Sequence, residues 1–152
     1  PRLRALVERL EAAALNPEVV PDITAQLWDK FLFNCAVNPL CTVTGLTPSG
    51  LVVDPALDAL RSQVIAEGEA VAAAQGIALR PGADRRIAEW CVGKTHEVSM
   101  VQHLRRGQNT EIDALNGLIA TQGAAKGLAT PVNGFLTTLV HGLERSWIRA
   151  DR

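Results

Sequence analysis

Four polar residues recur at every fourth position within residues 22–45, a segment that is otherwise mainly apolar. They are Gln26, Lys30, Asn34 and Asn38. Because a helix advances by roughly 100° per residue, successive members lie about 40° apart and form one line, the polar stripe. Apolar residues occupy the rest of the circumference, which predicts an interior helix. Amides and ammonium groups are costly to bury without partners, so the stripe predicts either hydrogen bonds to neighbouring helices or a hydrated cleft.

Apolar residues spaced three and four apart predict helices along the rest of the chain. We expect helices at 1–15, 22–44, 54–76, 84–91, 110–126 and from 131 onward, with turns at 45–53 and 77–83. Pro39 should kink or break the second helix and leave free backbone groups beside the polar stripe. No segment alternates as a strand does, so the sequence predicts a single all-α domain over residues 1–152.

The same spacing predicts which side chains are buried. Ile87, Trp90 and Cys91 should face the core from the short helix at 84–91. Phe135 and Trp147 should do so from the last helix. Gly68, inside the helix at 54–76, should mark close packing against a neighbouring helix, because glycine is otherwise unfavourable there.

Charge and length exclude several classes of protein. The 152 residues include 15 basic and 16 acidic side chains, which leaves no electrostatic footprint for nucleic acid or an anionic membrane. No apolar run is long enough to span a bilayer, so no membrane partner is expected. The amphipathic first segment lacks the features of a secretory signal, which predicts a cytoplasmic protein.

The cysteines and histidines do not form a metal-binding pattern. Cys35, Cys41 and Cys91 are odd in number and include no C-x-x-C pair, so we interpret them as small hydrophobic residues. His96 and His103 are seven residues apart, which is not a two-ligand spacing, and no metal is expected.

A second polar segment, residues 94–117, places a hydroxyl and a carboxylate at expected helix ends. Ser99 follows a polar turn, and Glu111 lies in the first turn of the helix expected from Thr110. Each has a structural interpretation, because Ser99 could cap a short helix and Glu111 could favour the positive end of its own helix. A functional interpretation remains open for both.

Four motifs occur in order along the chain. They are W-x-K-x-x-x-N-x-x-x-N-P-L at 28–40, S-M-x-x-x-L-x-x-G at 99–107, T-E-I-D-x-L-N-G at 110–117 and T-P-V-N at 130–133. In this order and spacing they resemble the carboxy-terminal domain of the ketopantoate reductase (2-dehydropantoate 2-reductase) family, over essentially the whole chain. The resemblance implies the helical fold of that domain, which is like the carboxy-terminal domain of 6-phosphogluconate dehydrogenase.

The resemblance also implies an activity, namely NADPH-dependent reduction of an α-keto acid in the pathway to pantothenate and coenzyme A. Lys30 would be the catalytic lysine, which stabilises charge on the ketone oxygen and donates a proton. Asn34 and Asn38 would position that ammonium and contact the substrate. Ser99 would bind the substrate carboxylate, and Glu111 would hold a substrate hydroxyl and help to orient Lys30.

The resemblance implies a partner as well, an amino-terminal Rossmann domain that binds NADPH. Its glycine fingerprint, G-x-G-x-x-G, is absent from this sequence, so we expect the chain alone to be inactive. The sequence leaves the oligomeric state open, a homodimer included.

Two questions remain open at this stage. His103 and Gln108 stand where family members often carry aspartate and arginine, and Pro48 and Ser49 stand where the pantothenate enzymes tend to have an asparagine. The preferred α-keto acid is therefore not fixed. The alternative function is a free-standing helical interaction or dimerisation module without activity.

Overall fold

The computed structural model describes the backbone of residues 2–150 and the side chains of residues 2–146. Its elements are α1 (Arg2–Ala12), α2 (Ile23–Thr44), α3 (Pro48–Val53), α4 (Pro55–Ala74), α5 (Ala83–Cys91), α6 (Ser99–Arg105), the 3₁₀ helix η1 (Ile112–Ala114), α7 (Asn116–Ala125) and α8 (Pro131–Ala150). The described part of the chain contains no strand, which confirms the all-α prediction.

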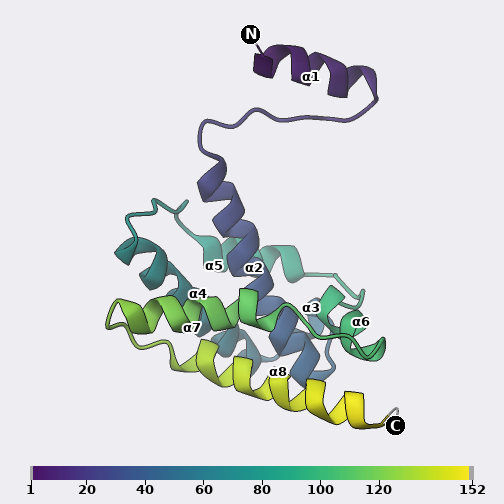
Figure 1. Cartoon of the computed structure of the whole chain (residues 1–152), viewed down its shortest axis with the longest axis vertical. Helices are drawn as coiled ribbons and strands as arrows, with labels where there is room; N and C mark the ends of the chain where they lie inside the picture. Colours follow the sequence, from purple (N-terminus) through teal and green to yellow (C-terminus); the bar gives the residue numbers. More distant parts are fainter. Residues whose placement is uncertain (1, 151–152) are drawn as a thin grey trace.

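Helix α2 is the central element, and α4, α6 and α8 all pack against it (Figure 1). Helix α1 lies apart from the bundle in the same view and contributes no buried residue. The central helix begins where the sequence predicts, because the Asp22 carboxylate accepts a hydrogen bond of 2.8 Å from the Thr24 N–H. It ends at Gly45, whose φ of 73° is the left-handed conformation that favours glycine.

Pro39 does not break α2, which continues to Thr44. A proline has no N–H to donate to the carbonyl four residues earlier, here that of Cys35. The Asn116 side chain supplies the missing donor, with its Nδ2 3.0 Å from the Cys35 oxygen. The expected break is therefore wrong, and the backbone group that proline frees is used to join α2 to the start of α7.

Three segments differ from the prediction, and the first is α6, since no helix at 99–105 is among those expected. Residues 45–53 are not all loop, because Thr47 caps α3 through the Gly50 N–H and Pro48 occupies the first helical turn. The helix expected from Thr110 begins only at Asn116, after a 3₁₀ turn. Thr110 instead donates its N–H and hydroxyl to Glu144 of α8, so a contact distant in sequence overrides the local helix signal.

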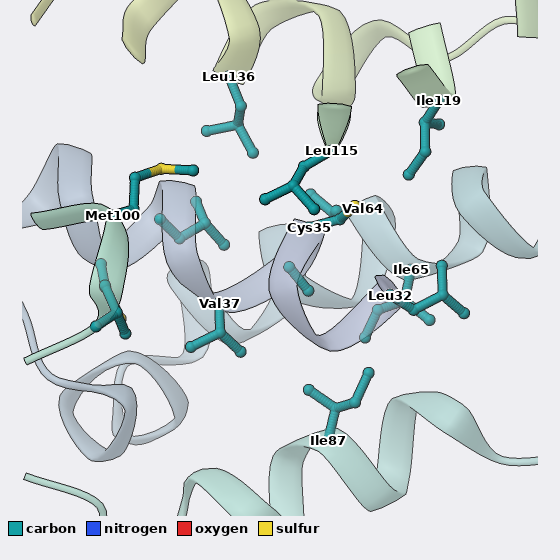
Figure 2. Close-up of a cluster of buried hydrophobic side chains, with 14 of the residues drawn as sticks. Leu32, Cys35, Val37, Val64, Ile65, Ile87, Met100, Leu115, Ile119 and Leu136 are labelled. Atoms are coloured by element: carbon teal, nitrogen blue, oxygen red, sulfur yellow. The ribbon is translucent and has the colours of Figure 1, made fainter. Parts of the chain in front are cut away.

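The core surrounds α2 from Leu32 onward (Figure 2). The figure labels side chains from α2, α4, α5, α6, α7 and α8 as well as Leu115, among them Leu32, Cys35, Val37, Val64, Ile65, Ile87, Met100, Ile119 and Leu136. The first turns of α2 are not interior, since Ile23 and Leu27 are exposed.

Two predicted core residues are at the surface instead. Trp90 is 43% exposed and Phe135 is 62% exposed, so both burial predictions are wrong. The predicted core position of the Trp147 side chain lies outside the described residues.

Gly68 lies where α4 meets α2, as predicted. A Cβ at this position would come within 2.4 Å of Leu32 Cδ2 and 3.3 Å of Ile119 Cδ1. We expect Gly68→Ala to lower the free energy of unfolding by about 1–2 kcal/mol, because overpacking outweighs the gain in helix propensity. The matched control is Gly142→Ala in α8, where nothing lies within 4 Å and a gain of about 0.5–1 kcal/mol is expected. Urea denaturation measures both, and equal effects at the two sites would contradict the packing argument.

The three cysteines are buried and unpaired within the described residues, as their interpretation as small hydrophobic residues requires. Burial raises the pKa of Cys41 to about 12, with a further contribution from Cys91. Burial likewise raises the pKa of Cys35. These thiols are therefore protonated and unreactive at neutral pH.

Among the described residues, none of the helices combines the length and the apolar character needed to cross a membrane.

Candidate functional site

The polar stripe faces an open cleft along one side of α2. This α2–α5 cleft has a volume of about 560 Å³. Its α2 wall includes Gln26, Lys30, Phe33 and Asn34, and the opposite wall includes Arg80, Arg86, Ile87 and Trp90. Of the two interpretations that the sequence left open, the hydrated cleft therefore describes the first three members of the stripe.

Burial increases along the polar stripe from Lys30 to Asn38. Lys30 is exposed, Asn34 is half-buried, and Asn38 is only 4% exposed. The Asn38 side chain makes no hydrogen bond with any described residue, although its backbone oxygen accepts one of 2.7 Å from Thr42. The Asn38 amide atoms are nevertheless not among the fully buried polar atoms that lack a partner, so the amide keeps some access to solvent or to a ligand.

The cleft carries a positive charge that sequence reasoning missed. Asp29 is held between Arg80, whose Nε lies 2.6 Å from Oδ2, and Arg86, whose Nη2 lies 2.8 Å from Oδ1. One carboxylate thus pairs with two guanidinium groups, and the Lys30 ammonium adds a third positive charge to the same cleft. A net positive cleft favours an anionic ligand. Arg80 lies within the predicted turn at 77–83 and Arg86 in the helix after it, and nothing in their local pattern shows that they lie opposite α2.

Ser99 and Glu111 are brought together, although twelve residues separate them. The Ser99 hydroxyl donates to Glu111 Oε1 over 3.5 Å, a long hydrogen bond, and His103 Nδ1 lies 3.1 Å from Oε2. The residue at the cap position of α6 is Val98, and the Ser99 side chain makes no capping bond. Glu111 precedes the 3₁₀ turn rather than lying in the first turn of α7. The structural interpretations of both residues are therefore wrong.

The position of Glu111 is fixed by its neighbours on both sides. Thr110 donates from its N–H at 2.7 Å and from its hydroxyl at 2.8 Å to Glu144 Oε1 on α8. Ile112 is fully buried. The Glu111 side chain is thus held at the surface between two anchored residues, where it remains partly open to solvent.

His141 completes the network that holds Thr110. Its Nδ1 lies 2.9 Å from Glu144 and its Nε2 2.9 Å from Asp113. The hydrogen bond to Glu144 is the main cause that raises the pKa of His141, against an opposing effect of burial and with further help from Asp113. Burial alone would raise the pKa of Glu144, but hydrogen bonds from Thr110 and His141 overcome it and lower that pKa.

This network predicts a pH-dependent stability. Because folding raises the pKa of His141, the protonated ring adds to the free energy of unfolding. This contribution is fully present below the ordinary pKa of 6.5, and it is lost as the pH rises through the pKa of His141 in the folded protein. At the acid end the contribution falls again as the pH passes below the lowered pKa of Glu144. We expect His141→Gln to cost about 0.5–1 kcal/mol near pH 6 and clearly less near pH 9. Urea denaturation at both pH values measures this, and a cost that does not change with pH would contradict it.

The five predicted site residues lie in three places, two of which hold a pair of residues and one of which holds Asn38 alone. Lys30 and Asn34 share the α2–α5 cleft, Ser99 and Glu111 share a hydrogen bond, and Asn38 lies deeper in α2, which packs against α6. Within the described residues, no hydrogen bond or ion pair joins Lys30 to Ser99 or Glu111. The orientation of Lys30 by Glu111 therefore stays a prediction.

Aromatic side chains extend from the cleft toward the second group. Phe33 and Trp90 pack edge to face with their ring centroids 4.3 Å apart, and the Trp90 and His96 rings are 5.9 Å apart. His96 precedes Ser99 by three residues. The cleft wall thus continues to the segment that carries Ser99. Sequence reasoning missed Trp90 and His103 as members of this region.

The described residues include no group of three His, Cys, Asp or Glu side chains that could hold a metal ion. The α2–α5 cleft has the volume of a small-molecule site, about 560 Å³. The sequence offers no glycine-rich loop for a dinucleotide phosphate, so these residues do not fit the phosphate part of a dinucleotide cofactor.

Comparisons with known proteins agree with the helical fold. Residues 22–144 match the model of the family described as ketopantoate reductase PanE/ApbA C terminal. A 2-dehydropantoate 2-reductase of Mesorhizobium japonicum is 32% identical over 142 residues, which are 93% of this chain and 44% of that protein. One of Archaeoglobus fulgidus is 32% identical over 91% of this chain and 47% of its own length.

Solved structures show the same relation. A PanE/ApbA family ketopantoate reductase from Ralstonia eutropha superposes with a TM-score of 0.86 and 35% identity, over 95% of this chain and 49% of that one. A D-mandelate dehydrogenase, solved with NADH and anilino(oxo)acetate, gives a TM-score of 0.89 and 29% identity over 96% of this chain and 62% of its own. The chain spans about half the length of the curated relatives that it matches.

Proposed function

Because this chain belongs to the ketopantoate reductase PanE/ApbA C-terminal family, we propose that it forms the substrate-binding part of a reductase for 2-oxo acids. The substrate would be 2-dehydropantoate or a related acid, and the product would serve pantothenate and coenzyme A biosynthesis in the cytoplasm. The observation that carries the proposal is that Lys30 and Asn34 open into one positively charged cleft.

The residue types suit reduction of a ketone. A nicotinamide nucleotide, when bound, would supply the hydride. Lys30 would place its ammonium beside the ketone oxygen, offset the negative charge that develops there and donate the proton that completes the alcohol. An exposed lysine at a cleft can exchange its proton with solvent between turnovers. This is the catalytic role that we assign to Lys30.

The other site residues would bind and orient the substrate. Asn34 would donate to the substrate from the next turn of α2, and the unpartnered Asn38 amide would complete the binding surface below it. Ser99 can donate its hydroxyl to a carboxylate. Glu111 can accept from a substrate hydroxyl, and its bonds to Ser99 and His103 keep that carboxylate in place.

The complete protein would also contain a nucleotide-binding Rossmann domain amino-terminal to this chain. The length of the relatives supports this, because they are about twice as long. NADPH is our proposed cofactor, although the mandelate dehydrogenase structure contains NADH. A reading frame upstream of Pro1 that encodes a strand followed by G-x-G-x-x-G would support the proposal.

The direct test is an assay of the full-length protein. We expect oxidation of NADPH to depend on an added 2-oxo acid, with 2-dehydropantoate among the substrates tested, and we expect no turnover with residues 1–152 alone. If the full-length protein oxidises neither NADPH nor NADH with any 2-oxo acid, the proposal fails. The alternative, an interaction or dimerisation module without activity, would then be favoured.

A further inference from the structure

Trp90 presents an unusually large apolar surface to the α2–α5 cleft. It lies in the last turn of α5 and lines the cleft while 43% of its surface stays exposed. A tryptophan in a helix with a strong apolar face would normally turn toward the core, as Ile87 does with only 5% exposure. Trp90 therefore contributes more to the cleft than to the core.

The Trp90 ring is fixed in position by three neighbours. Phe33 packs against it edge to face at 4.3 Å with an interplanar angle of 74°, and the His96 ring lies 5.9 Å away at 89°. The Lys94 ammonium lies 5.4 Å from the ring centroid, within reach of a cation–π contact. A ring held in this way forms a preorganised wall, which loses little conformational freedom when a ligand packs on it.

This wall lies beside the residues that we propose to bind the reacting part of the substrate. Lys30, Phe33 and Asn34 come from successive turns of α2 and all line the cleft, while Trp90 faces them from α5. If the ketone oxygen of a 2-oxo acid binds Lys30 and its carboxylate binds polar groups, the other substituent on the ketone carbon still needs a binding surface. The apolar lining of the cleft consists of Phe33 on α2 and of Ala83, Ile87 and Trp90 on α5, so this substituent would pack there.

We infer that this cleft selects 2-oxo acids with an aromatic or similarly large apolar substituent on the ketone carbon, and that Trp90 is the residue that determines this preference. The inference rests on the proposed function. A cleft of about 560 Å³ is within the range of pockets for drug-sized ligands and leaves unfilled space around a substrate as small as pyruvate. Aromatic rings also pack favourably edge to face, as Phe33 and Trp90 already do.

The test compares two substrates in the full-length protein. The quantity measured is the ratio of kcat/KM for phenylglyoxylate to kcat/KM for pyruvate, with the nicotinamide nucleotide that the protein uses. We expect the native ratio to favour phenylglyoxylate and Trp90→Ala to lower it about 10-fold to 100-fold. Trp90→Phe keeps an aromatic surface and should stay near the native ratio, and Trp90→Leu should lie between. Because a ratio is measured, partial loss of folded protein does not affect it.

Phe135→Ala provides the matched control, since Phe135 is an aromatic residue of α8 that is 62% exposed and does not line the cleft. This variant should leave the ratio unchanged. If 2-dehydropantoate is reduced but the ratio favours pyruvate, or does not respond to Trp90→Ala, the inference is wrong while the proposed function stands. If no 2-oxo acid is reduced, the proposed function is wrong and the inference with it.

Discussion

Replacing Lys30 by alanine in the full-length protein should lower kcat by about 10²-fold to 10⁴-fold. The ammonium is the only proposed group that both offsets charge on the ketone oxygen and donates a proton to it, so its removal affects the transition state more than the bound substrate. Steady-state kinetics with the preferred 2-oxo acid measure this, and KM should change much less than kcat.

Two further variants sharpen this prediction. Lys30→Arg keeps a positive charge but cannot release a proton at neutral pH, so it should keep a near-native KM without recovering turnover. Lys126→Ala removes an exposed lysine beyond the end of α7 and should have native kinetics. Full activity in Lys30→Ala would discard the catalytic assignment.

Asn133→Ala should lower the free energy of unfolding by about 2–4 kcal/mol. Asn133 is fully buried, and its Nδ2 lies 2.6 Å from Glu67 Oε2 and 3.3 Å from the Val64 oxygen. Asn133 Oδ1 accepts a hydrogen bond of 2.9 Å from Asn116 Nδ2, and Asn116 Nδ2 also donates to the Cys35 carbonyl in α2. Truncation would leave several of these buried groups without a partner, which costs more than the hydrogen bonds themselves contribute.

Asn109→Ala is the matched control, since Asn109 is exposed in the turn before Thr110. Its effect should be within about 0.5 kcal/mol of zero. Chemical denaturation followed by circular dichroism compares the two variants at equal m-value. A change below about 1 kcal/mol in Asn133→Ala would contradict the role of this network in joining α2, α4, α7 and α8.

The network also explains why the four sequence motifs contain residues that stabilise the fold as well as proposed site residues. Asn116 and Asn133 belong to two of the motifs, yet both are buried in hydrogen bonds between helices and do not face the α2–α5 cleft. Pro39 belongs with them, since it frees the carbonyl that Asn116 satisfies. Likeness of sequence alone could not separate these residues from Lys30 and Asn34.

The polar stripe was predictable because helical periodicity is a local property. Residues four apart share one face of a helix whatever surrounds it, so Lys30 and Asn34 could be assigned to one side of α2. The gradient of burial from Lys30 to Asn38 could not be predicted in the same way. It depends on where α2 enters the bundle, which the other helices determine.

The remaining features depend on contacts between distant segments. Trp90 has a helical spacing that suits either the core or the surface, and only the placement of α5 against Phe33 decides between them. Thr110 has the chemistry of a helix cap but is bound by Glu144, thirty-four residues later. His103 meets Glu111 because the intervening turn at Gly107, with a φ of 63°, reverses the chain. None of these contacts has a signal within its own segment.

A crystal structure of the full-length protein with oxidised nucleotide and a bound 2-oxo acid would test the central claim most directly. The quantity to measure is the distance between Lys30 Nζ and the ketone oxygen. We expect a hydrogen bond of about 2.7–3.2 Å, with the rest of the acid lying along Asn34 in the α2–α5 cleft. An acid bound elsewhere, with Lys30 pointing into solvent and α2 contributing no contact to it, would contradict the account.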